Sequence, residues 1–282
     1  LNDPHSLTLI DRLIDPLLDK LVRNKMRDRF GGRLKAMVSG GAPLNPKIGS
    51  FFIALGVRLL QGYGQTETSP VVSANVPNKI KVATVGPPLD GVEVKIAEDG
   101  EILVRGDCVM KGYWNEPEAT AKALEGGWLH TGDVGELDRD GYIVITDRKK
   151  DFIKNSGGDM IAPARIEGAL TLEPEIAQAM VYGDRKPYLV AVIVPAEEVL
   201  KHAKGDDVAL QKTIGAVVSR INQGLATIER VRRFVVAPEA FTTANGQMTP
   251  TLKIRRHEIG KAYGPALEAL YRRNARSISM IH

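Results

Sequence analysis

The chain has 282 residues, of which 43% are hydrophobic and 26% are charged. This length favours two domains, and this composition excludes a disordered, collagen-like or disulfide-scaffold protein. The 38 basic and 34 acidic residues give a net charge of +4 and are interspersed, which is typical of a solvated mixed-charge surface.

The amino-terminal third alternates helices, strands and glycine turns. Apolar residues from Ile10 to Val22 fall on one helical face, which predicts a helix that bends or restarts at Pro16. We favour a protein core as the partner of this apolar face, because such faces usually pack against a core. The basic residues that follow, from Lys20 to Arg29, leave a membrane surface as the alternative. Next we predict a strand at 34–38, a turn at 39–43, a helix at 47–55, a strand at 57–60 and a turn at 61–64. This order is typical of a parallel α/β sheet, where ligands gather at the carboxyl ends of strands.

From residue 81 to 147 the sequence has the alternation typical of antiparallel strands. We predict strands at 92–96, 101–105 and 141–145, with Asp-Gly turns at 90–91, 99–100 and 140–141. The charged cluster at 147–151 marks a boundary between two domains, 1–147 and 148–282. In the second domain we predict strands at 177–182 and 188–194 and helices at 163–172, 208–223 and 253–263. The predicted fold is α/β plus antiparallel β, followed by a small α+β carboxyl-terminal domain.

A glycine-rich segment after the second predicted strand carries residues suited to a nucleotide. In Gln61-Gly62-Tyr63-Gly64-Gln65-Thr66-Glu67, the glycines allow the backbone to approach a ligand closely. Tyr63 offers a flat face to a base, Thr66 offers a hydroxyl to a phosphate, and Glu67 offers a carboxylate to Mg²⁺. Any one of these residues alone is better explained by a glycine turn with a solvated tail, but together they favour a nucleotide site.

Asp133 follows a glycine in the segment Trp128-Leu129-His130-Thr131-Gly132-Asp133, and we place it at a strand end. A carboxylate presented there suits the two hydroxyls of a ribose, whereas in isolation Asp133 reads as a turn residue.

Several familiar signatures are absent from the sequence. It has no Gly-x-x-x-x-Gly-Lys-Ser/Thr loop, no Gly-x-Gly-x-x-Gly fingerprint, no His-Glu-x-x-His and no Gly-x-Ser-x-Gly. A run of about 18 apolar residues and a signal-peptide pattern are also missing. The single cysteine, Cys108, cannot form an internal disulfide. We therefore expect a cytoplasmic protein without a metal cluster, and the 5% aromatic content argues against a nucleic-acid partner.

Ordered motifs along the chain resemble those of adenylate-forming enzymes. The sequence resembles the carboxyl-terminal part of a long-chain fatty acid CoA ligase of that superfamily, and the resemblance covers nearly the whole chain. The motifs are Ser39-Gly40-Gly41-Ala42-Pro43, Gly62-Tyr63-Gly64-Gln65-Thr66-Glu67, Val109-Met110-Lys111-Gly112-Tyr113-Trp114, His130-Thr131-Gly132-Asp133, Asp147-Arg148-Lys149-Lys150-Asp151, Gly157-Gly158-Asp159-Met160-Ile161-Ala162-Pro163 and Met248-Thr249-Pro250-Thr251-Leu252-Lys253.

The resemblance implies that residues 1–147 are the carboxyl-terminal part of a large adenylating domain and that 148–282 are a small mobile domain. Within the nucleotide site, Tyr63 would stack on adenine, Thr66 would contact the α-phosphate and Glu67 would hold Mg²⁺. Asp133 and Arg148 would bind the ribose hydroxyls. The implied nucleotide-binding residues are Gly40, Gly41, Ala42, Pro43, Gly62, Tyr63, Gly64, Gln65, Thr66, Asp133 and Arg148.

The resemblance also implies the catalytic and CoA-binding residues. Lys253 would be catalytic, together with Thr66 and Glu67, because an ammonium between a carboxylate and the ATP α-phosphate stabilises the charge of the transition state. Lys150 would be the hinge between the two domains. Ser156, Gly157 and Gly158 would line the CoA tunnel.

One departure from the superfamily concerns the phosphates. The Ser/Thr/Gly-rich loop ending in Pro-Lys-Gly, which grips the β- and γ-phosphates, is absent from the sequence, as is most of the fatty-acyl tunnel. We therefore interpret the chain as a fragment that is inactive alone. Its parent would use ATP, Mg²⁺ and CoA to convert a fatty acid into acyl-AMP and then acyl-CoA, in the cytoplasm or at a membrane contacted through the acyl substrate. Two alternatives stay open: a fatty acyl-AMP ligase that loads a carrier protein, and an isolated nucleotide-binding fragment.

Overall fold

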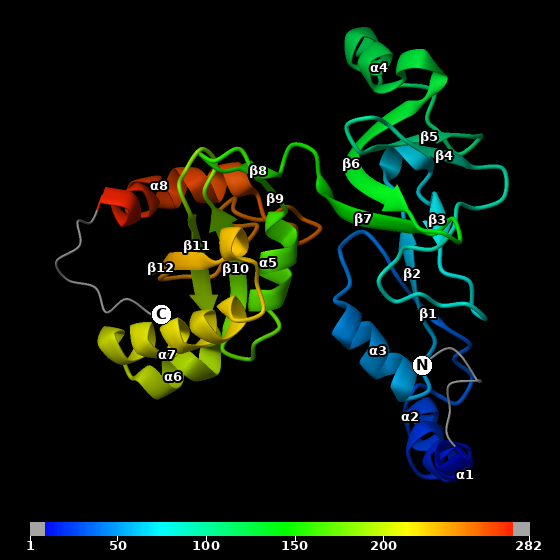
Figure 1. Cartoon of the computed structure of the whole chain (residues 1–282), viewed down its shortest axis with the longest axis horizontal. Helices are drawn as coiled ribbons and strands as arrows, with labels where there is room; N and C mark the ends of the chain where they lie inside the picture. Colours follow the sequence, from blue (N-terminus) through cyan, green and yellow to red (C-terminus); the bar gives the residue numbers. More distant parts are fainter. Residues whose placement is uncertain (1–8, 273–282) are drawn as a thin grey trace. The chain divides into compact units, whose positions relative to one another are not determined.

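The computed structural model describes residues 9–272 and divides the chain into two compact units, Leu1–Lys149 and Lys150–His282 (Figure 1). The division falls two residues after the boundary that we expected from the charged cluster. The first residues of that cluster belong to a strand that pairs Asp147 and Arg148 with the preceding strand, so the first unit extends past them. Among the described residues, no helix is long and apolar enough to cross a bilayer.

The amino-terminal helical segment is wound in three ways. It continues through Pro16 and changes to a π-helical turn directly after the first helix, so the chain is not restarted at the proline. Our interpretation of its apolar face as core is wrong for this structure, because Leu17 is 56% exposed and Leu21 is 51% exposed. The segment comprises α1 (Leu9–Leu18), the π-helix η2 (Asp19–Arg23) and α2 (Asn24–Arg29).

The first sheet follows the expected order of strand, helix and strand. Strands β1 (Met37–Ser39) and β2 (Leu59–Tyr63) are parallel, and helix α3 (Pro46–Ala54) connects them. The Asn45 side chain caps α3 by accepting a hydrogen bond from the Lys47 amide at 2.9 Å. The turn predicted at 61–64 is wrong for its first three residues, because Gly62 and Tyr63 pair with β3 (Ser73–Ala74) and prolong β2.

The second sheet of the first unit is antiparallel, with strand order β4-β5-β6-β7. Its second, third and fourth strands pack Ile102, Leu129 and Ile143 into one core with Tyr63. We did not predict β6, and our placement of Asp133 at a strand end is wrong, because the residue lies inside β6. Two glycines and Asp133 lower the β-propensity of this stretch, which conceals the strand in the sequence. The elements are β4 (Glu93–Ile96), β5 (Glu101–Arg105), α4 (Pro117–Ala123), η4 (Glu125–Gly127), β6 (Leu129–Leu137) and β7 (Ile143–Arg148).

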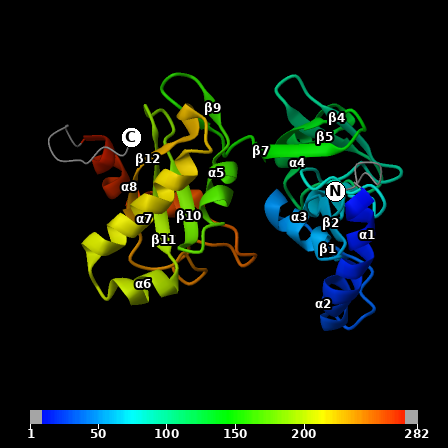
Figure 2. The ribbon, with the colours of Figure 1, turned by 60° about the horizontal axis from the view of Figure 1, so that its bottom comes forward.

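The second unit is built on a mixed three-stranded sheet. Strand β11 (Leu189–Pro195) is central, antiparallel to β10 (Ile176–Tyr182) and parallel to β12 (Val231–Val236), and all seven of its residues are buried. Because side chains alternate along a strand, Ala191 and Ile193 face one core while Val190 and Val192 face another. The helices that cover the two faces are α5 and α7 on one side and α8 on the other (Figure 2).

The sequence predicted most elements of this unit but missed several short ones. The last helix begins only at Arg256 and not at Lys253, and it runs on to Arg272. Strands β8, β9 and β12 and helix α6 were not predicted. The elements are β8 (Ile153–Lys154), β9 (Met160–Ile161), α5 (Pro163–Leu170), β10 (Ile176–Tyr182), β11 (Leu189–Pro195), α6 (Glu197–Ala203), α7 (Asp207–Asn222), η5 (Thr227–Glu229), β12 (Val231–Val236) and α8 (Arg256–Arg272).

A bidentate ion pair joins α5 to the start of α8. The two nitrogens of the Arg256 guanidinium lie 2.6 Å from the two carboxylate oxygens of Glu167. Glu167 also accepts a hydrogen bond from the Val181 amide of β10 at 2.7 Å. The pair therefore ties a helix on each side of the sheet to the sheet itself.

We expect Glu167→Ala to lower the free energy of unfolding of the second unit by about 3 kcal/mol, since it leaves a poorly exposed guanidinium without its carboxylate. Urea unfolding of the whole chain measures this change in free energy. Hydrogen exchange of the β10 and β11 amides assigns it to the second unit. The control is Lys201→Ala, which breaks an exposed ion pair with Glu197 and should change that free energy by no more than about 0.5 kcal/mol. Equal effects of the two variants would contradict the structural importance of the Glu167 pair.

Candidate functional site

The centre of the candidate site is the carboxylate of Asp133, which is 5% exposed. The Tyr63 hydroxyl donates to its Oδ2 at 2.7 Å, and Arg148 Nε lies 3.1 Å from its Oδ1. Burial, reinforced by the charge of Asp133, raises the pKa of Tyr63 far above its ordinary value, so the phenol stays protonated and donates. The structure thus brings together three of the residues that we expected at the nucleotide, from strands β2, β6 and β7.

A bulge in β6 sets the direction of the Asp133 side chain. On β5, Glu101 pairs with Val134 and Leu103 pairs with His130, so three residues of β6, 131–133, face the single residue Ile102. Gly132 lies in the middle of the bulge with φ +70°, a conformation that favours glycine. Bulges re-aim side chains next to functional sites, and this one accompanies the turn of Asp133 toward Tyr63 and Arg148.

The glycine loop after β1 lies beside the end of β2. A Cβ added to Gly40 would lie 3.4 Å from the carbonyl oxygen of Gly62, so the two backbones are in contact. Gly41, Ala42 and Pro43 are exposed. Parallel pairing of β1 and β2 places Ser39 opposite Gln61, which brings both glycine segments to the same carboxyl-terminal edge of the sheet.

The short helix η3 (Thr66–Thr68) presents Thr66 and Glu67. Gln65 and Thr68 form a capping box at its start, and the side-chain amide of Gln65 donates to the Thr131 carbonyl of the bulge at 3.3 Å. Gly64 fits before this helix because an added Cβ would lie 2.0 Å from the Pro70 carbonyl oxygen. Thr66 itself is exposed.

Glu67 is held by a neighbour that the sequence did not assign to the site. The Tyr113 hydroxyl donates to Glu67 Oε1 at 2.9 Å, and the Met110 amide donates to the Glu67 carbonyl at 2.8 Å. Among the described residues, no group of three His, Cys, Asp or Glu side chains could hold a metal ion. A single carboxylate nevertheless suits Mg²⁺ that is bound mainly by substrate phosphates and water.

Lys253 lies on an exposed loop of the second unit. Its amide donates to Thr249 Oγ1 at 3.0 Å, and its carbonyl accepts from the Thr249 amide at 2.8 Å. Met248 and Ile254 form an antiparallel bridge at the base of this loop. The Arg256 guanidinium, bonded to Glu167, follows directly, so the lysine is displayed on a closed loop with a fixed base.

The remaining predicted residues of the second unit are exposed. Lys150 is its first residue, and Ser156, Gly157 and Gly158 form the turn between β8 and β9. The Ser156 amide donates to the Lys186 carbonyl at 3.0 Å, which holds one side of this turn. The hinge role of Lys150 and the CoA contacts of the turn stay predictions.

Glu101 is a buried charged residue that sequence reasoning missed. Its Oε1 accepts from the Gly132 amide at 2.8 Å, and its Oε2 lies 3.1 Å from His130 Nδ1 and 3.2 Å from Lys149 Nζ. Burial raises the pKa of Glu101, but these three partners outweigh burial, and its pKa lies below the ordinary value. The alternating pattern of β5 gave no signal, because a charged residue at a strand end reads as solvated.

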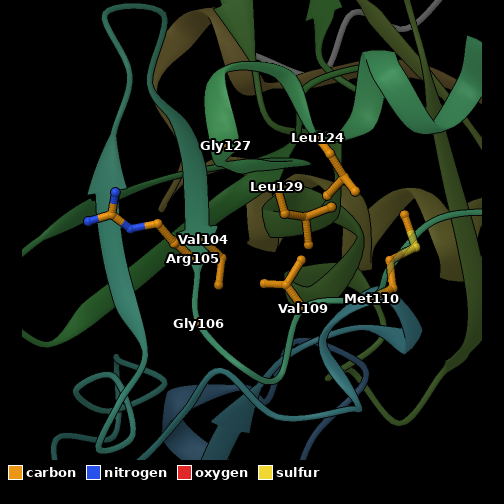
Figure 3. Close-up of a pocket in the computed structure, with 8 residues that line it drawn as sticks. All are labelled: Val104, Arg105, Gly106, Val109, Met110, Leu124, Gly127 and Leu129. Carbon is orange, nitrogen blue, oxygen red and sulfur yellow. The ribbon is translucent and has the colours of Figure 1, made fainter.

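A small cavity of about 230 Å³ lies elsewhere in the first unit. Its walls are mainly apolar, and the Arg105 side chain points away from it (Figure 3). The Arg105 guanidinium lies over the ring of Trp128, 4.5 Å from its centroid. The residues that line the cavity are Val104, Arg105, Gly106, Val109, Met110, Leu124, Gly127 and Leu129. None of them belongs to the predicted nucleotide site.

Comparisons with known proteins agree with this fold. The profile of the AMP-binding enzyme family matches residues 3–114, and that of the AMP-binding enzyme C-terminal domain matches residues 150–275. The chain therefore belongs to the AMP-binding enzymes, the adenylate-forming superfamily. Within that superfamily it matches long-chain fatty acid CoA ligases over most of its length, which confirms the family that the motifs indicated.

Two curated relatives illustrate the match. The long-chain-fatty-acid–CoA ligase FadD15 of Mycobacterium bovis is 39% identical over 89% of this chain and 44% of its own length. The human long-chain-fatty-acid–CoA ligase 6 is 34% identical over 91% of this chain and 40% of its own length. The chain thus spans less than half the length of these relatives.

Solved structures show the same fold. The adenylation domain of a carboxylate reductase from Mycobacterium chelonae is 28% identical, with a TM-score of 0.77, over 92% of this chain and 42% of that one. The A-PCP didomain of the carboxylic acid reductase from Segniliparus rugosus, in complex with AMP, is 30% identical with a TM-score of 0.74, over 88% of this chain and 36% of that one. The first is an adenylation domain and the second is an A-PCP didomain, and the likeness agrees with the mixed α/β architecture expected from the sequence.

The lowered pKa of Glu101 predicts acid sensitivity of the first unit. A carboxylate whose pKa is lower in the folded state contributes stability that is complete above its unfolded pKa and is lost as the pH falls through its folded pKa. We therefore expect the free energy of unfolding to decrease as the pH falls below about 4.5, and to decrease less steeply in Glu101→Gln. Urea unfolding of both proteins between neutral and acidic pH measures the two slopes. Identical slopes would show that Glu101 does not contribute.

Proposed function

We propose that this chain is part of an enzyme that activates a long-chain fatty acid with ATP to acyl-AMP and transfers the acyl group to CoA. The similarity to long-chain-fatty-acid–CoA ligases supports the class of acid and the thiol acceptor. The observation that carries the nucleotide assignment is the buried Asp133 carboxylate between Tyr63 and Arg148. The products would be acyl-CoA, AMP and pyrophosphate.

Asp133 and Arg148 would bind the ribose. A carboxylate accepts hydrogen bonds from both hydroxyls of a diol, and the guanidinium beside it donates to the same oxygens. Arg148 is exposed and Asp133 buried, so a ribose would meet the guanidinium first and the carboxylate behind it. Gly41 would let the backbone approach the base, because no atom lies within 4 Å of a Cβ added there. Tyr63 is 8% exposed, so it would stack on adenine only through the small accessible part of its ring.

The phosphates would meet Thr66, Glu67 and Lys253. Thr66 is exposed, and its hydroxyl suits the α-phosphate. Mg²⁺ would be held by Glu67, whose carboxylate Tyr113 orients, together with phosphate oxygens, and it would neutralise charge on the leaving pyrophosphate. The ammonium of Lys253 would stabilise the negative charge that gathers as the fatty acid carboxylate attacks phosphorus.

The thiol acceptor would approach the second unit. The turn of Ser156, Gly157 and Gly158 is exposed and largely without side chains, which suits close passage of pantetheine. The backbone angles of Lys150 would change between the step that forms acyl-AMP and the step that forms the thioester. A carrier protein bearing phosphopantetheine has the same reactive thiol, so rates with free CoA and with carrier protein distinguish the two acceptors.

ATP–pyrophosphate exchange in the protein that contains this chain tests the proposed activation step. We expect exchange that depends on added long-chain fatty acid, followed by acyl-CoA formation when CoA is present. Exchange driven by amino acids or short aromatic acids, and not by fatty acids, would contradict the proposed substrate.

Asp133→Ala should weaken ATP binding by about 1.5–3 kcal/mol, because the ribose loses a charged acceptor. Titration calorimetry measures the affinity. Asp133→Asn keeps an acceptor for Tyr63 and shows whether a loss of affinity comes from local misfolding. The matched control is Asp107→Ala, which removes an exposed carboxylate of the same unit and should leave the affinity unchanged; a loss in the control equal to that in Asp133→Ala would remove Asp133 from the site.

Lys253→Ala should abolish formation of acyl-AMP and spare thioester formation from supplied acyl-AMP, because the ammonium serves only the first transition state. Pyrophosphate exchange reports the first step and release of AMP from acyl-AMP with CoA reports the second. Lys201→Ala removes another exposed lysine of the second unit and should change neither rate. Retained exchange in Lys253→Ala would exclude this lysine from adenylation.

A further inference from the structure

Some backbone groups of the bulge at residues 131–133 form no hydrogen bond within the strand ladder. Three side chains bind these groups instead. The Thr131 carbonyl accepts from Gln65 Nε2, and the Asp133 amide donates to Thr131 Oγ1 at 3.1 Å. The Gly132 amide donates to Glu101 Oε1 at 2.8 Å. The carbonyl of Gly132 accepts from the Lys149 amide at 2.8 Å.

Among these partners only Glu101 is a charged acceptor, and it is 5% exposed. Burial makes the loss of this hydrogen bond costly when the side chain is too short to reach the amide, whereas an oxygen acceptor of the same length, charged or neutral, still satisfies it. The same carboxylate holds Lys149 Nζ, and the Lys149 backbone holds the Gly132 carbonyl. Gly132 is therefore fixed through both of its backbone groups, directly before Asp133.

We propose that Glu101 is a positioning residue of the nucleotide site, whose carboxylate fixes the Gly132 amide and Lys149 and thereby aims Asp133 at the ribose. This inference rests on the proposed role of Asp133 in nucleotide binding. Glu101 would act through the bulge and not by contact with the ligand. The length of its side chain, more than its charge, determines whether Asp133 is in place. Gly132 links Glu101 to Asp133. Its φ of +70° depends on where its amide is held, so the hydrogen bond to Glu101 also determines the direction of the Asp133 side chain.

Two substitutions separate length from charge. Glu101→Gln keeps the length and the acceptor for the Gly132 amide but removes the charge. Glu101→Asp keeps the charge but withdraws the carboxylate by about one carbon–carbon bond, about 1.5 Å, from the amide. The control is Asp99→Asn. Asp99 contacts Lys149 Nζ at 2.5 Å and accepts from the Glu101 amide at 3.1 Å, an acceptor that asparagine keeps, and no hydrogen bond joins its side chain to residues 131–133.

Titration of the folded chain with AMP, below the temperature at which any variant unfolds, provides the first measurement. We expect Glu101→Asp to weaken AMP binding about tenfold and Glu101→Gln and Asp99→Asn to stay within about twofold of the original chain. Equal AMP affinity in Glu101→Asp and the original chain would overturn the proposal. A loss in Glu101→Gln as large as in Glu101→Asp would overturn the claim that length is decisive.

Hydrogen exchange of the Gly132 amide in the ligand-free chain provides the second measurement. The exchange rate should rise about tenfold in Glu101→Asp and stay near the original in Glu101→Gln, while the amides of β11 in the other unit do not change. This result does not depend on nucleotide binding. If the original chain fails to bind AMP, the proposed function fails, and the exchange rate still decides whether Glu101 fixes the bulge.

Discussion

A carboxylate that is removed from water must be met by donors, and the Asp133 carboxylate is met by one strand of each sheet in the first unit. Tyr63 belongs to the first sheet and Arg148 to the second, so the pairing of both side chains with Asp133 joins the two sheets of the first unit. The regular pairing of β6 is interrupted by a bulge at this point, and Gly132 accommodates it. The candidate nucleotide site and the junction between the sheets therefore share the same residues.

In the second unit, the residues that form the core are distinct from the residues proposed to act on substrates. Its sheet is covered on both faces, and the central strand is entirely buried. The residues proposed to act on substrates, Lys253 and the turn at 156–158, are exposed and lie on short loops that leave this core. Because the Glu167–Arg256 pair sits at the base of the lysine loop, the loop begins from a rigid point.

Periodicity was sufficient for the elements with strong patterns and failed where local chemistry opposed the tertiary structure. The parallel pair β1 and β2, the β4–β5 hairpin of the second sheet and the helices α3, α5 and α7 follow from apolar spacing and glycine turns. Strand β6 was missed because Gly132, Asp133 and Gly135 are poor strand formers, and only pairing with β5 and β7 carries the strand through this stretch. The exposed apolar face of the first helices shows the reverse case, in which a core-like pattern has no core against it.

The candidate site was predictable in its residue types but not in its contacts. The motifs indicated Tyr63, Asp133 and Arg148 individually, and the resemblance placed them around one nucleotide. The hydrogen bond from the Tyr63 phenol to Asp133 joins residues that are 70 positions apart in the sequence. It depends on the packing of two sheets. The same is true of Tyr113 with Glu67 and of Glu101 with Gly132, neither of which any local pattern specifies.

The positions of the tryptophans give the two units different spectroscopic properties. The sequence has two tryptophans, Trp114 and Trp128, and both belong to the first unit. Trp114 is 89% exposed, whereas the charged groups of Lys95 and Arg105 lie over the ring of Trp128, 4.2 Å and 4.5 Å from its centroid. Tryptophan emission therefore reports events in the first unit alone, through one solvated ring and one ring covered by two cations. The second unit contains no tryptophan, so changes in the first unit can be followed at those wavelengths without a label and without a contribution from the second.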